Sequence, residues 1–345
     1  MSAPNILCDT KGMTRERWLD CRMHGPKGDI PYTLGGSDIA AIFGVSPWVT
    51  PKELWLIKKG RMKVPPKSNE LQLELGHLLE PIAARLYELK SKNIVEEDTL
   101  LYQHAHYPYA LANFDRRIIR KEDGERGILE CKSTSHFKAD AWKDDGCPLY
   151  YELQLRFYLA VADVSFGDFA AIWGNNPDND FAMPRLIRDP VMEGQIFERC
   201  DEFIWSLVHD KEPTMEDIAP KLALESLAKI YGSSQPGLPT IEFPKEYEGD
   251  LRRIAELQQQ VSDHRKQADK LEKEAEARSV RIAELMMKHE HGVLETTKDK
   301  LLIDFVSRKT TRVDVARLKD EKPSIYEEFK KTTESHKVKV SVQAI

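Results

Sequence analysis

The feature that most constrains the fold of this chain is a series of β-like stretches enclosed between helical patterns. Five short stretches follow one another at 93–95, 100–103, 111–114, 117–119 and 127–132, and a sixth lies at 169–173. Residues with the spacing of helices come before and after them, at 14–23, 38–43, 51–60, 69–89, 149–161, 191–207 and 220–230. This order predicts a mixed α/β (α+β) domain in which helices flank a central mixed sheet.

Local signals define several of these helices. Ser37 precedes an apolar run and is expected to cap the helix at 38–43. Thr50 and Glu53 form a capping box at the start of the next helix. In the third helix Pro81 is expected to produce a kink. The apolar stripe of that helix is expected to face the core, and it consists of Leu71, Leu75, Leu78, Leu79, Ile82, Leu86 and Leu89.

A change of composition near residue 231 divides the chain. A globular domain at 1–230 is followed by a Gly-, Pro- and Ser-rich linker at 231–246. A long coiled-coil-like helix follows at 247–290, and a small α+β segment follows at 291–345. That last segment contains an alternating, strand-like run at 338–342.

The long helix has a poor heptad seam. Three of its d positions are Asp250, His264 and Arg278, and two of its a positions are Ala268 and Ala275. A parallel dimer would bury like charges and thin alanine layers, so a free-standing coiled coil is not expected. We expect the helix to pack against the segment that follows it, as an arm that docks on the globular domain, a neighbouring subunit or a partner. The apolar residues available for that packing are Leu294, Leu301, Leu302 and Phe305.

Charge and cysteine content narrow the class of protein. A net charge of −6 does not indicate a nucleic-acid binder, although a local basic groove can coexist with acidic helices. The five cysteines are scattered without a CxxC pair, which argues against a zinc ribbon or an iron–sulfur cluster. No run approaches the ~20 apolar residues of a membrane span, and residues 1–15 lack the apolar core of a signal peptide. We therefore expect a cytoplasmic protein without a membrane partner.

The strongest chemical signal is Glu130-x-Lys132 in the fifth β-like stretch. Alternate side chains of a strand point to the same face, so Glu130 and Lys132 are expected to project together. Metal-dependent cleavage of a phosphodiester needs a carboxylate to hold the ion, and it benefits from a cation near the attacking water. The same spacing recurs from Glu88 and from Glu328, but both copies lie in helical patterns and are expected to be solvated surface.

A second acidic residue, Asp115, lies where it can join Glu130. It ends the apolar run at 111–114 and is separated from the Glu-x-Lys stretch by a turn at 122–125. The pattern predicts a hairpin that presents Asp115 and Glu130 on neighbouring strands. Mg²⁺ prefers such oxygen ligands, completed by water and substrate phosphate. Taken alone, Asp115 is equally consistent with a turn or capping residue.

Three further residues are weaker candidates. Glu80 lies one helical turn after Gly76, where a nucleic acid could approach closely, but alone it resembles a surface glutamate. Gln154 and Tyr158 share one face of a helix. A glutamine can bond a phosphate or a metal-bound water, whereas plain packing near the core explains the pair equally well.

In this order the motifs resemble the YqaJ-type viral recombinase family, relatives of lambda exonuclease in the PD-(D/E)xK nuclease superfamily. The resemblance extends over roughly residues 14–210. The motifs that carry it lie at 36–44, 76–81, 115, 129–132 and 154–158, accompanied by Trp142, Tyr150 and Tyr151.

The resemblance implies a restriction-endonuclease-like core and a metal-dependent deoxyribonuclease. The implied activity is the 5′→3′ degradation of one strand of linear duplex DNA. The implied cofactors are two Mg²⁺ ions, for which Mn²⁺ can substitute. The ions would be held mainly by Asp115, Glu130 and the backbone carbonyl of Cys131, with a contribution from Glu80.

The resemblance also assigns roles to residues around the acids. Lys132 would position or activate the water, and Gln154 would support it. Arg22 and Ser37 fall where such exonucleases bind the 5′-phosphate of the recessed strand, and Tyr158 would join them in DNA binding. A serine at the start of a helix is physically suited to holding a phosphate.

The implied partners are duplex DNA with a free end and a single-strand annealing recombinase. Relatives can form homo-oligomeric rings around DNA, and members are typically encoded by a phage or prophage and act in the bacterial cytoplasm. The tail at about 310–340, with Asp314, Pro323 and Tyr326, resembles C-terminal extensions of phage members. The long helix is a departure from the minimal lambda-type enzyme.

Two other functions stay open on the sequence. A structure-specific or site-specific endonuclease would share the fold and would also cut covalently closed circles. A non-catalytic DNA-binding scaffold that acts through the long helix belongs to another class. Such a scaffold would be expected to lack one of Asp115, Glu130 or Lys132, and all three are present.

Overall fold

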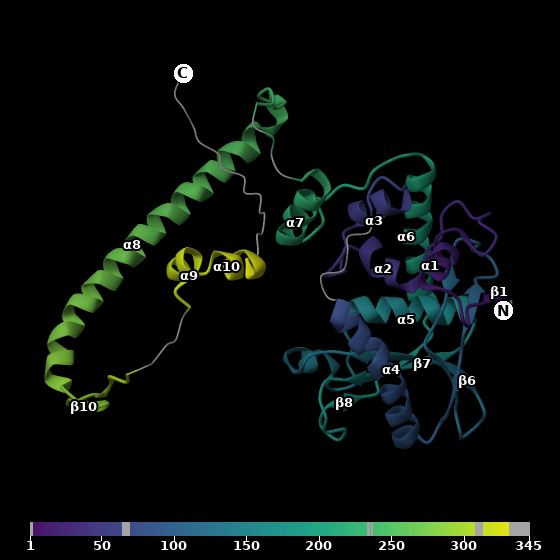
Figure 1. Ribbon diagram of the computed structural model, residues 1–345, viewed down its shortest axis with the longest axis horizontal. Helices are drawn as coiled ribbons and strands as arrows, with labels where there is room; N and C mark the ends of the chain where they lie inside the picture. The colour runs from purple at the N-terminus through teal and green to yellow at the C-terminus, as the bar shows by residue number, and fades with distance from the viewer. Residues whose placement is uncertain (1–2, 64–69, 233–234, 236, 308–312, 331–345) are drawn as a thin grey trace. The chain divides into compact units, whose positions relative to one another are not determined.

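The computed structural model of the protein describes residues 3–63, 70–232, 235, 237–307 and 313–330. Contacts divide the chain into two compact units, Met1–Gly232 and Ser233–Ile345 (Figure 1). Among the described residues of the second unit only Met286 is buried, so the hydrophobic core belongs to the first unit.

A six-stranded mixed sheet forms the centre of the first unit. Its order is β2-β5-β6-β7-β8, and β9 also pairs with β7. Strands β6 and β7 are parallel, and the other pairs are antiparallel. The bounds are β2 (Ile94–Glu97), β5 (Arg116–Ile119), β6 (Arg126–Ser133), β7 (Phe166–Ile172), β8 (Phe181–Ala182) and β9 (Arg185–Ile187). The predicted fold class, a mixed α/β domain, is confirmed.

Helices cover both faces of this sheet (Figure 1). On one face α4 contributes Ala83, Ala84 and Tyr87 to a cluster with Leu129 of β6 and Phe166 of β7. On the other face α5 packs against β6 and β7, and α2 and α6 pack on α5. The helices are α1 (Arg15–His24), α2 (Gly36–Ile42), α3 (Pro51–Lys58), α4 (Glu70–Ser91), α5 (Leu149–Ala162), α6 (Pro190–Val208) and α7 (Pro220–Tyr231).

A smaller sheet and a short 3₁₀ helix complete the unit. The sheet has the order β1-β3-β4, with β1 (Asn5–Asp9), β3 (Leu100–Gln103) and β4 (Leu111–Ala112). The 3₁₀ helix η1 (His136–Trp142) follows β6. The sequence did not predict β1, β8, β9 or η1, because each is too short to show a clear periodicity.

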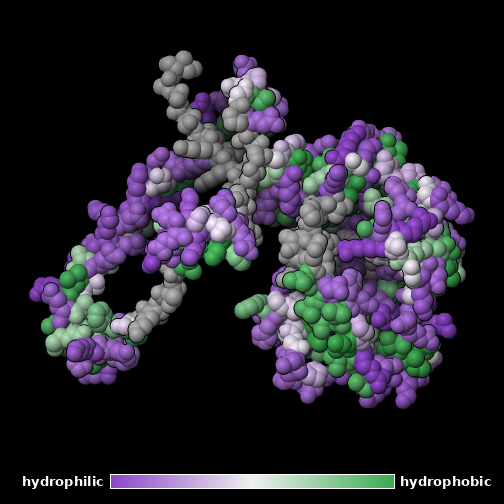
Figure 2. Space-filling view, in the orientation of Figure 1, coloured by the Kyte–Doolittle hydropathy of each residue, from purple (hydrophilic) through white to green (hydrophobic). Residues whose placement is uncertain are grey.

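The predicted core face of α4 is wrong. Leu71, Leu75, Leu78 and Ile82 are 50% to 86% exposed, and Figure 2 shows apolar surface where Figure 1 places this helix. The residues that meet the sheet are instead the small alanines and Tyr87. Small side chains allow the helix backbone to approach the strands closely. The buried face of α4 is therefore determined by close packing and not by the number of leucines on it.

The two predicted helix caps have different outcomes. Ser37 is not an N-cap, because α2 begins at Gly36, two residues before the predicted start, with Gly35 at the cap. The side chain of Asp38, at the third helical position, accepts a hydrogen bond from the Gly35 amide at 2.9 Å, which is the N3 half of a capping box. The capping box of α3 is confirmed: the Thr50 amide donates to Glu53 at 2.9 Å, and the Glu53 amide donates to Thr50 Oγ1 at 3.2 Å.

The second unit consists of a long helix and small elements. They are η2 (Lys245–Tyr247), α8 (Glu248–Met286), β10 (His291–Glu295), β11 (Lys300–Asp304), α9 (Val315–Glu321) and α10 (Pro323–Phe329). The predicted packing of the segment after α8 along that helix is wrong. The four apolar side chains expected to make it, Leu294, Leu301, Leu302 and Phe305, are 47% to 75% exposed.

The reason lies in the size of the β10–β11 hairpin. Within the described residues its two five-residue strands pair only with each other, and Gly292 of β10 lies against Met286 at the end of α8. A pair of short strands covers the end of a helix rather than its length. The strand-like run at 338–342 lies outside the described residues. In the described part of the chain no helix is long and apolar enough to cross a membrane.

Candidate active site

The candidate active site is built on the β5–β6 hairpin. Arg116 pairs with Leu129, and Asp115, one residue before β5, therefore lies beside Glu130 of β6. The sequence placed Asp115 at the end of the preceding strand, whereas it lies directly before the next one. The predicted hairpin itself is confirmed.

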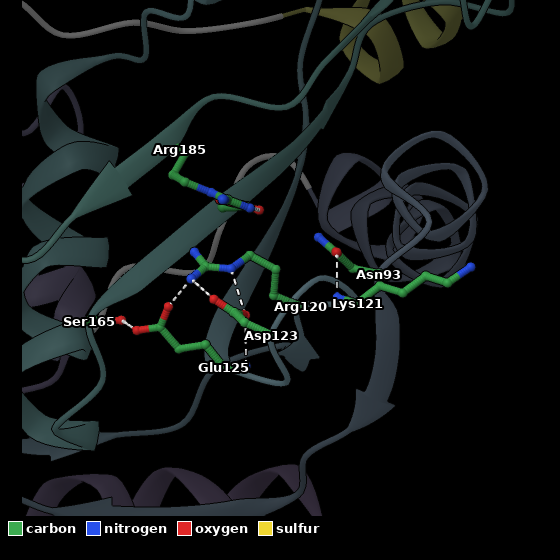
Figure 3. Close-up of polar contacts among 8 residues, drawn as sticks. Asn93, Arg120, Lys121, Asp123, Glu125, Ser165 and Arg185 are labelled. Carbon is green, nitrogen blue, oxygen red and sulfur yellow. Dashed lines mark hydrogen bonds and ion pairs between the residues drawn. The ribbon is translucent and has the colours of Figure 1, made fainter.

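Polar contacts at the opposite end of the hairpin fix its register (Figure 3). Arg120 Nε donates to Asp123 at 2.9 Å, and its guanidinium also binds Glu125, which is bonded to Ser165. The Glu125 amide donates to Asp123 at 3.0 Å, so the turn is closed on itself. A one-residue slip would break this network and would move Asp115 away from Glu130.

Glu130 is the centre of the site. It is 1% exposed, and its Oε2 atom accepts hydrogen bonds from Lys132 Nζ at 2.7 Å and from Gln154 Nε2 at 3.1 Å. Its Oε1 atom is buried and has no hydrogen-bond partner among the described residues. A buried carboxylate oxygen without a partner is costly and points to a ligand that the protein chain itself does not supply.

The two other acids are held by neighbouring groups. Asp115 Oδ2 accepts a hydrogen bond from the Cys131 amide at 2.7 Å, which ties the start of β5 to the centre of β6. Arg116 Nη1 donates to Glu80 Oε1 at 2.6 Å and to the Asp115 carbonyl at 2.5 Å. Arg116 thus links α4 to the hairpin. The sequence reasoning missed Arg116, although its place directly after Asp115 was a usable signal.

The acids perturb one another's ionisation. Burial and the negative charge of Asp115 raise the pKa of Glu130 to about 7. Burial and Asp115 also raise the pKa of Glu80, against the opposing effect of Arg116. Burial disfavours the charge of Lys132, but Glu130 and Asp115 outweigh it and raise the Lys132 pKa. Such mutual effects are typical of buried carboxylates that share a site.

The donor set fits a hard divalent cation. Within the described ranges no group of three or more His, Cys, Asp or Glu side chains is arranged to hold a metal ion. Mg²⁺, however, keeps several waters and often binds proteins through only one or two carboxylates plus substrate phosphate. The unbonded Oε1 of Glu130 beside Asp115 offers that kind of incomplete oxygen site.

The candidate phosphate-binding residues Arg22 and Ser37 come together from α1 and α2. Arg22 Nη2 lies 3.3 Å from Ser37 Oγ, and its guanidinium stacks 4.6 Å from the centre of the Trp18 ring. A Cβ atom at Gly36, beside Ser37, would lie 2.5 Å from the Tyr158 ring. Glycine there lets α2 approach α5 closely, which brings Arg22 and Ser37 towards the residues of α5.

Tyr158 lies beneath this contact. It is 3% exposed, and burial followed by the negative charge of Glu130 raises its pKa to about 12. Gln154 Nε2 lies 3.4 Å from its hydroxyl and 3.1 Å from Glu130. This burial favours a role for Tyr158 in supporting Gln154 over the direct DNA contact expected from the sequence.

The comparisons with known proteins define the family. Residues 17–165 match the YqaJ-like viral recombinase domain. The chain is 30% identical over 334 residues to the uncharacterized protein YqaJ of Bacillus subtilis (strain 168), a match that covers 95% of this chain and 94% of that protein. The chain therefore belongs to the YqaJ-like viral recombinase family.

Similar solved structures include two exonucleases. An alkaline exonuclease, LHK-Exo from Laribacter hongkongensis, is 17% identical with a TM-score of 0.46, and the match covers 57% of this chain and 94% of that chain. A phage related exonuclease from Haemophilus somnus 129PT is 14% identical with a TM-score of 0.36, and the match covers 52% of this chain and 96% of that chain.

Proposed function

We propose that this protein is a Mg²⁺-dependent DNA exonuclease that degrades one strand of linear duplex DNA in the 5′→3′ direction. The observation that carries the proposal is the buried, unbonded Oε1 of Glu130, which lies on the hairpin beside Asp115 and on the same strand as Lys132. A divalent cation would supply the partner that this oxygen lacks. Duplex DNA with a free end is the matching substrate.

The residues divide the chemistry among them. Asp115 and Glu130, with the Cys131 carbonyl and Glu80, would hold Mg²⁺, or Mn²⁺ in its place, and two such ions would polarise the phosphate and make water more acidic. Arg116 keeps Glu80 beside the hairpin through its 2.6 Å ion pair.

Lys132 and Gln154 both bind Glu130. Both donate to the same oxygen, Oε2, and this leaves Oε1 turned away from them. Lys132 keeps its proton because Glu130 and Asp115 raise its pKa. A fixed positive charge here would position the attacking water and stabilise the negative charge that develops on the phosphate.

Arg22 and Ser37 would bind the 5′-phosphate of the strand being degraded. The guanidinium can donate two hydrogen bonds to a phosphate, and stacking on Trp18 holds its plane in place. A terminal phosphate bound at this point would set the direction of degradation, because it would place the first phosphodiester near Glu130.

The biological role follows from the proposed polarity. Degradation of the 5′-ended strand leaves a 3′ single-stranded overhang, the substrate of a single-strand annealing recombinase. We propose such a recombinase as the partner, in the cytoplasm of a bacterium that carries the encoding phage or prophage. We further propose a homo-oligomer, with a ring as one form.

The decisive experiment uses 5′-phosphorylated linear duplex with a different label on each strand. The full chain is incubated with this DNA in Mg²⁺, in Mn²⁺ and in EDTA, and a covalently closed circle of the same sequence serves as the matched control. We expect shortening from each 5′ end in either metal, with no cutting in EDTA and no cutting of the circle.

Other outcomes would select the alternatives. Cleavage of the circle would indicate a structure-specific or site-specific endonuclease on the same fold. Binding of linear duplex without any cleavage, in either metal, would contradict an enzyme and favour a scaffold that acts through α8. Shortening from 3′ ends would contradict the proposed polarity alone.

A further inference from the structure

Trp48 is an unusually open aromatic residue close to the candidate active site. It lies in the loop between α2 and α3 and is 54% exposed. The buried Ser46 hydroxyl accepts hydrogen bonds from the Trp48 amide at 3.2 Å and from the Val49 amide at 3.3 Å. These hydrogen bonds fix the backbone turn that carries Trp48, whereas about half of the Trp48 side chain is exposed to solvent.

A series of ring contacts leads from Trp48 to Lys132. The Trp48 ring meets Tyr150 edge to face at 5.1 Å and lies 6.3 Å from Tyr151. The Tyr151 ring in turn lies 5.1 Å from Lys132 Nζ and 5.8 Å from the buried Trp142. The ring of Trp142 thus belongs to the core and that of Tyr151 to the site, whereas the ring of Trp48 faces solvent.

This arrangement suits a nucleobase rather than a charged ligand. The exposed part of Trp48 offers an apolar π surface. Successive bases of a strand are spaced by ~3.4 Å, and the 5.1 Å and 6.3 Å separations place the Trp48 ring within about 11 Å of Lys132 Nζ, which corresponds to about three nucleotide steps. A strand cut beside Lys132 would therefore bring a base to Trp48.

We propose that Trp48, backed by Tyr150, is a stacking platform for a base that lies within about three nucleotides of the scissile phosphate. This inference rests on the proposed function, and it adds a DNA-positioning residue outside the acidic centre. Stacking accepts any base, because every base has a π face. Such a contact is therefore compatible with an exonuclease that advances through any sequence.

The test measures the affinity of the full chain for 5′-phosphorylated linear duplex by fluorescence anisotropy in Mg²⁺. The parent protein carries Glu130→Gln, so that the DNA stays intact. Trp48→Ala, Trp48→Phe and Trp205→Ala are added to it separately. Trp205 is the matched control, since it is 48% exposed on α6 and stacks only on His209 among the rings described.

A second series places one abasic site at each of the first three nucleotides of the 5′-ended strand. We expect Trp48→Ala to weaken binding of intact duplex about tenfold, Trp48→Phe to restore most of the affinity, and Trp205→Ala to have no effect. One abasic position should weaken binding to the parent to a similar extent and should cause no further loss in Trp48→Ala. Thermal melting of each variant is measured alongside.

The results separate this proposal from the proposed function. Dissociation constants of Trp48→Ala within about twofold of the parent, or an abasic penalty that persists in Trp48→Ala, would overturn the platform. The wild-type chain is assayed in parallel for cleavage of linear duplex. If it cuts none, the proposed function fails and the platform fails with it; if it cuts normally while Trp48→Ala binds like the parent, only the platform fails.

Discussion

The two units of this protein differ in what stabilises them. Met1–Gly232 encloses a core around a mixed sheet, whereas Ser233–Ile345 has a single buried apolar residue, Met286, among those described. The long helix α8 carries local ion pairs such as Arg252–Glu248 and Arg278–Glu274, each with both side chains largely exposed. Pairs of this kind contribute only about 0.3–0.5 kcal/mol each.

The difference in burial shows which unit can hold catalytic side chains in fixed positions. Chemistry that depends on distances of a few tenths of an ångström requires side chains fixed by packing, and the hairpin of Asp115 and Glu130 has that support. The exposed α8 lacks that support. The predictions below test this division.

The largest effect is expected at the buried member of the Glu-x-Lys pattern. Glu130→Ala should reduce cleavage by about 10³-fold or more, because it removes a metal-binding carboxylate. Glu328→Ala is the matched control, since Glu328 has the same spacing to Lys330 on the exposed α10 of the second unit. Rates are measured on linear duplex. Equal rates for the two variants would remove the catalytic assignment of Glu130.

Lys132→Arg should reduce the rate by about 10²-fold while metal affinity is retained. Lysine places a compact charge 2.7 Å from Glu130 Oε2, and the wider planar guanidinium does not fit the space between Glu130 and Tyr151 in the same way. Single-turnover rates and Mn²⁺ binding are measured together. A variant that cleaves like the wild type would make Lys132 only a charge partner of Glu130.

The double variant Arg22→Ala with Ser37→Ala should lose a preference of roughly tenfold for 5′-phosphorylated over 5′-hydroxyl ends. The 3.3 Å approach of the two side chains defines the proposed phosphate site. The measurement is the ratio of cleavage rates on the two kinds of end, with Arg199→Ala on the exposed face of α6 as the control. An unchanged ratio would disprove the site.

The pKa of Glu130 gives a smaller effect on stability. Because its folded pKa is raised to about 7 from an ordinary value of 4.5, its protonated form favours the fold below pH 4.5, and this contribution is lost as pH rises through 7. The metal-free protein should therefore unfold more easily at pH 8 than at pH 6, and Mg²⁺ should raise the melting temperature more at pH 8, by a few degrees.

Thermal melts in EDTA and in Mg²⁺ at the two pH values measure this difference. Glu130→Gln cannot titrate, so it should show little of the pH-dependent gain from Mg²⁺. A metal-induced shift that is the same at pH 6 and pH 8 in the wild type would show that Glu130 does not bind the ion.

The smallest effect on cleavage is expected from removal of the second unit. A chain that ends at Gly232 should cut DNA within about threefold of the full chain, because the buried core is complete. A chain that ends at Ile218 is the comparison, because it also loses α7 and the 2.8 Å contact of Ser226 with Thr50. It should be less stable by about 2 kcal/mol in denaturant unfolding.

A peptide of residues 247–287 tests whether α8 is stable without the rest of the protein. We expect it to be monomeric and only partly helical at micromolar concentration, since its ion pairs are weak and its apolar residues are exposed. Sedimentation and circular dichroism measure this. A fully helical dimer would make α8 an oligomerisation element, and a large loss of cleavage on truncation at Gly232 would place part of the active site in the second unit.

The hairpin shows how far sequence reasoning reached. Alternation along 127–132 and the turn at 122–125 predicted the pair of strands, because strand periodicity and turn chemistry act between neighbours in the chain. The start of α2 was predicted two residues late, with Ser37 as the cap, because the true N-cap residue, Gly35, has no polar side chain that marks it. The prediction of the buried face of α4 failed for a different reason. Which face of that helix is buried depends on its packing against β6 and β7, which lie far along the chain.

The sequence by itself determined the fold class, the shared face of Glu130 and Lys132, and the presence of a long, weakly apolar helix after residue 247. These follow from periodicities of two to seven residues, which any chain displays before it folds. Only the tertiary structure decided that Glu130 Oε1 is buried without a partner, that Arg22 reaches Ser37, and that Trp48 stays open beside the site. Each of these depends on elements far apart in the chain, because burial and close contact are set by which surfaces meet and not by the pattern of either surface alone.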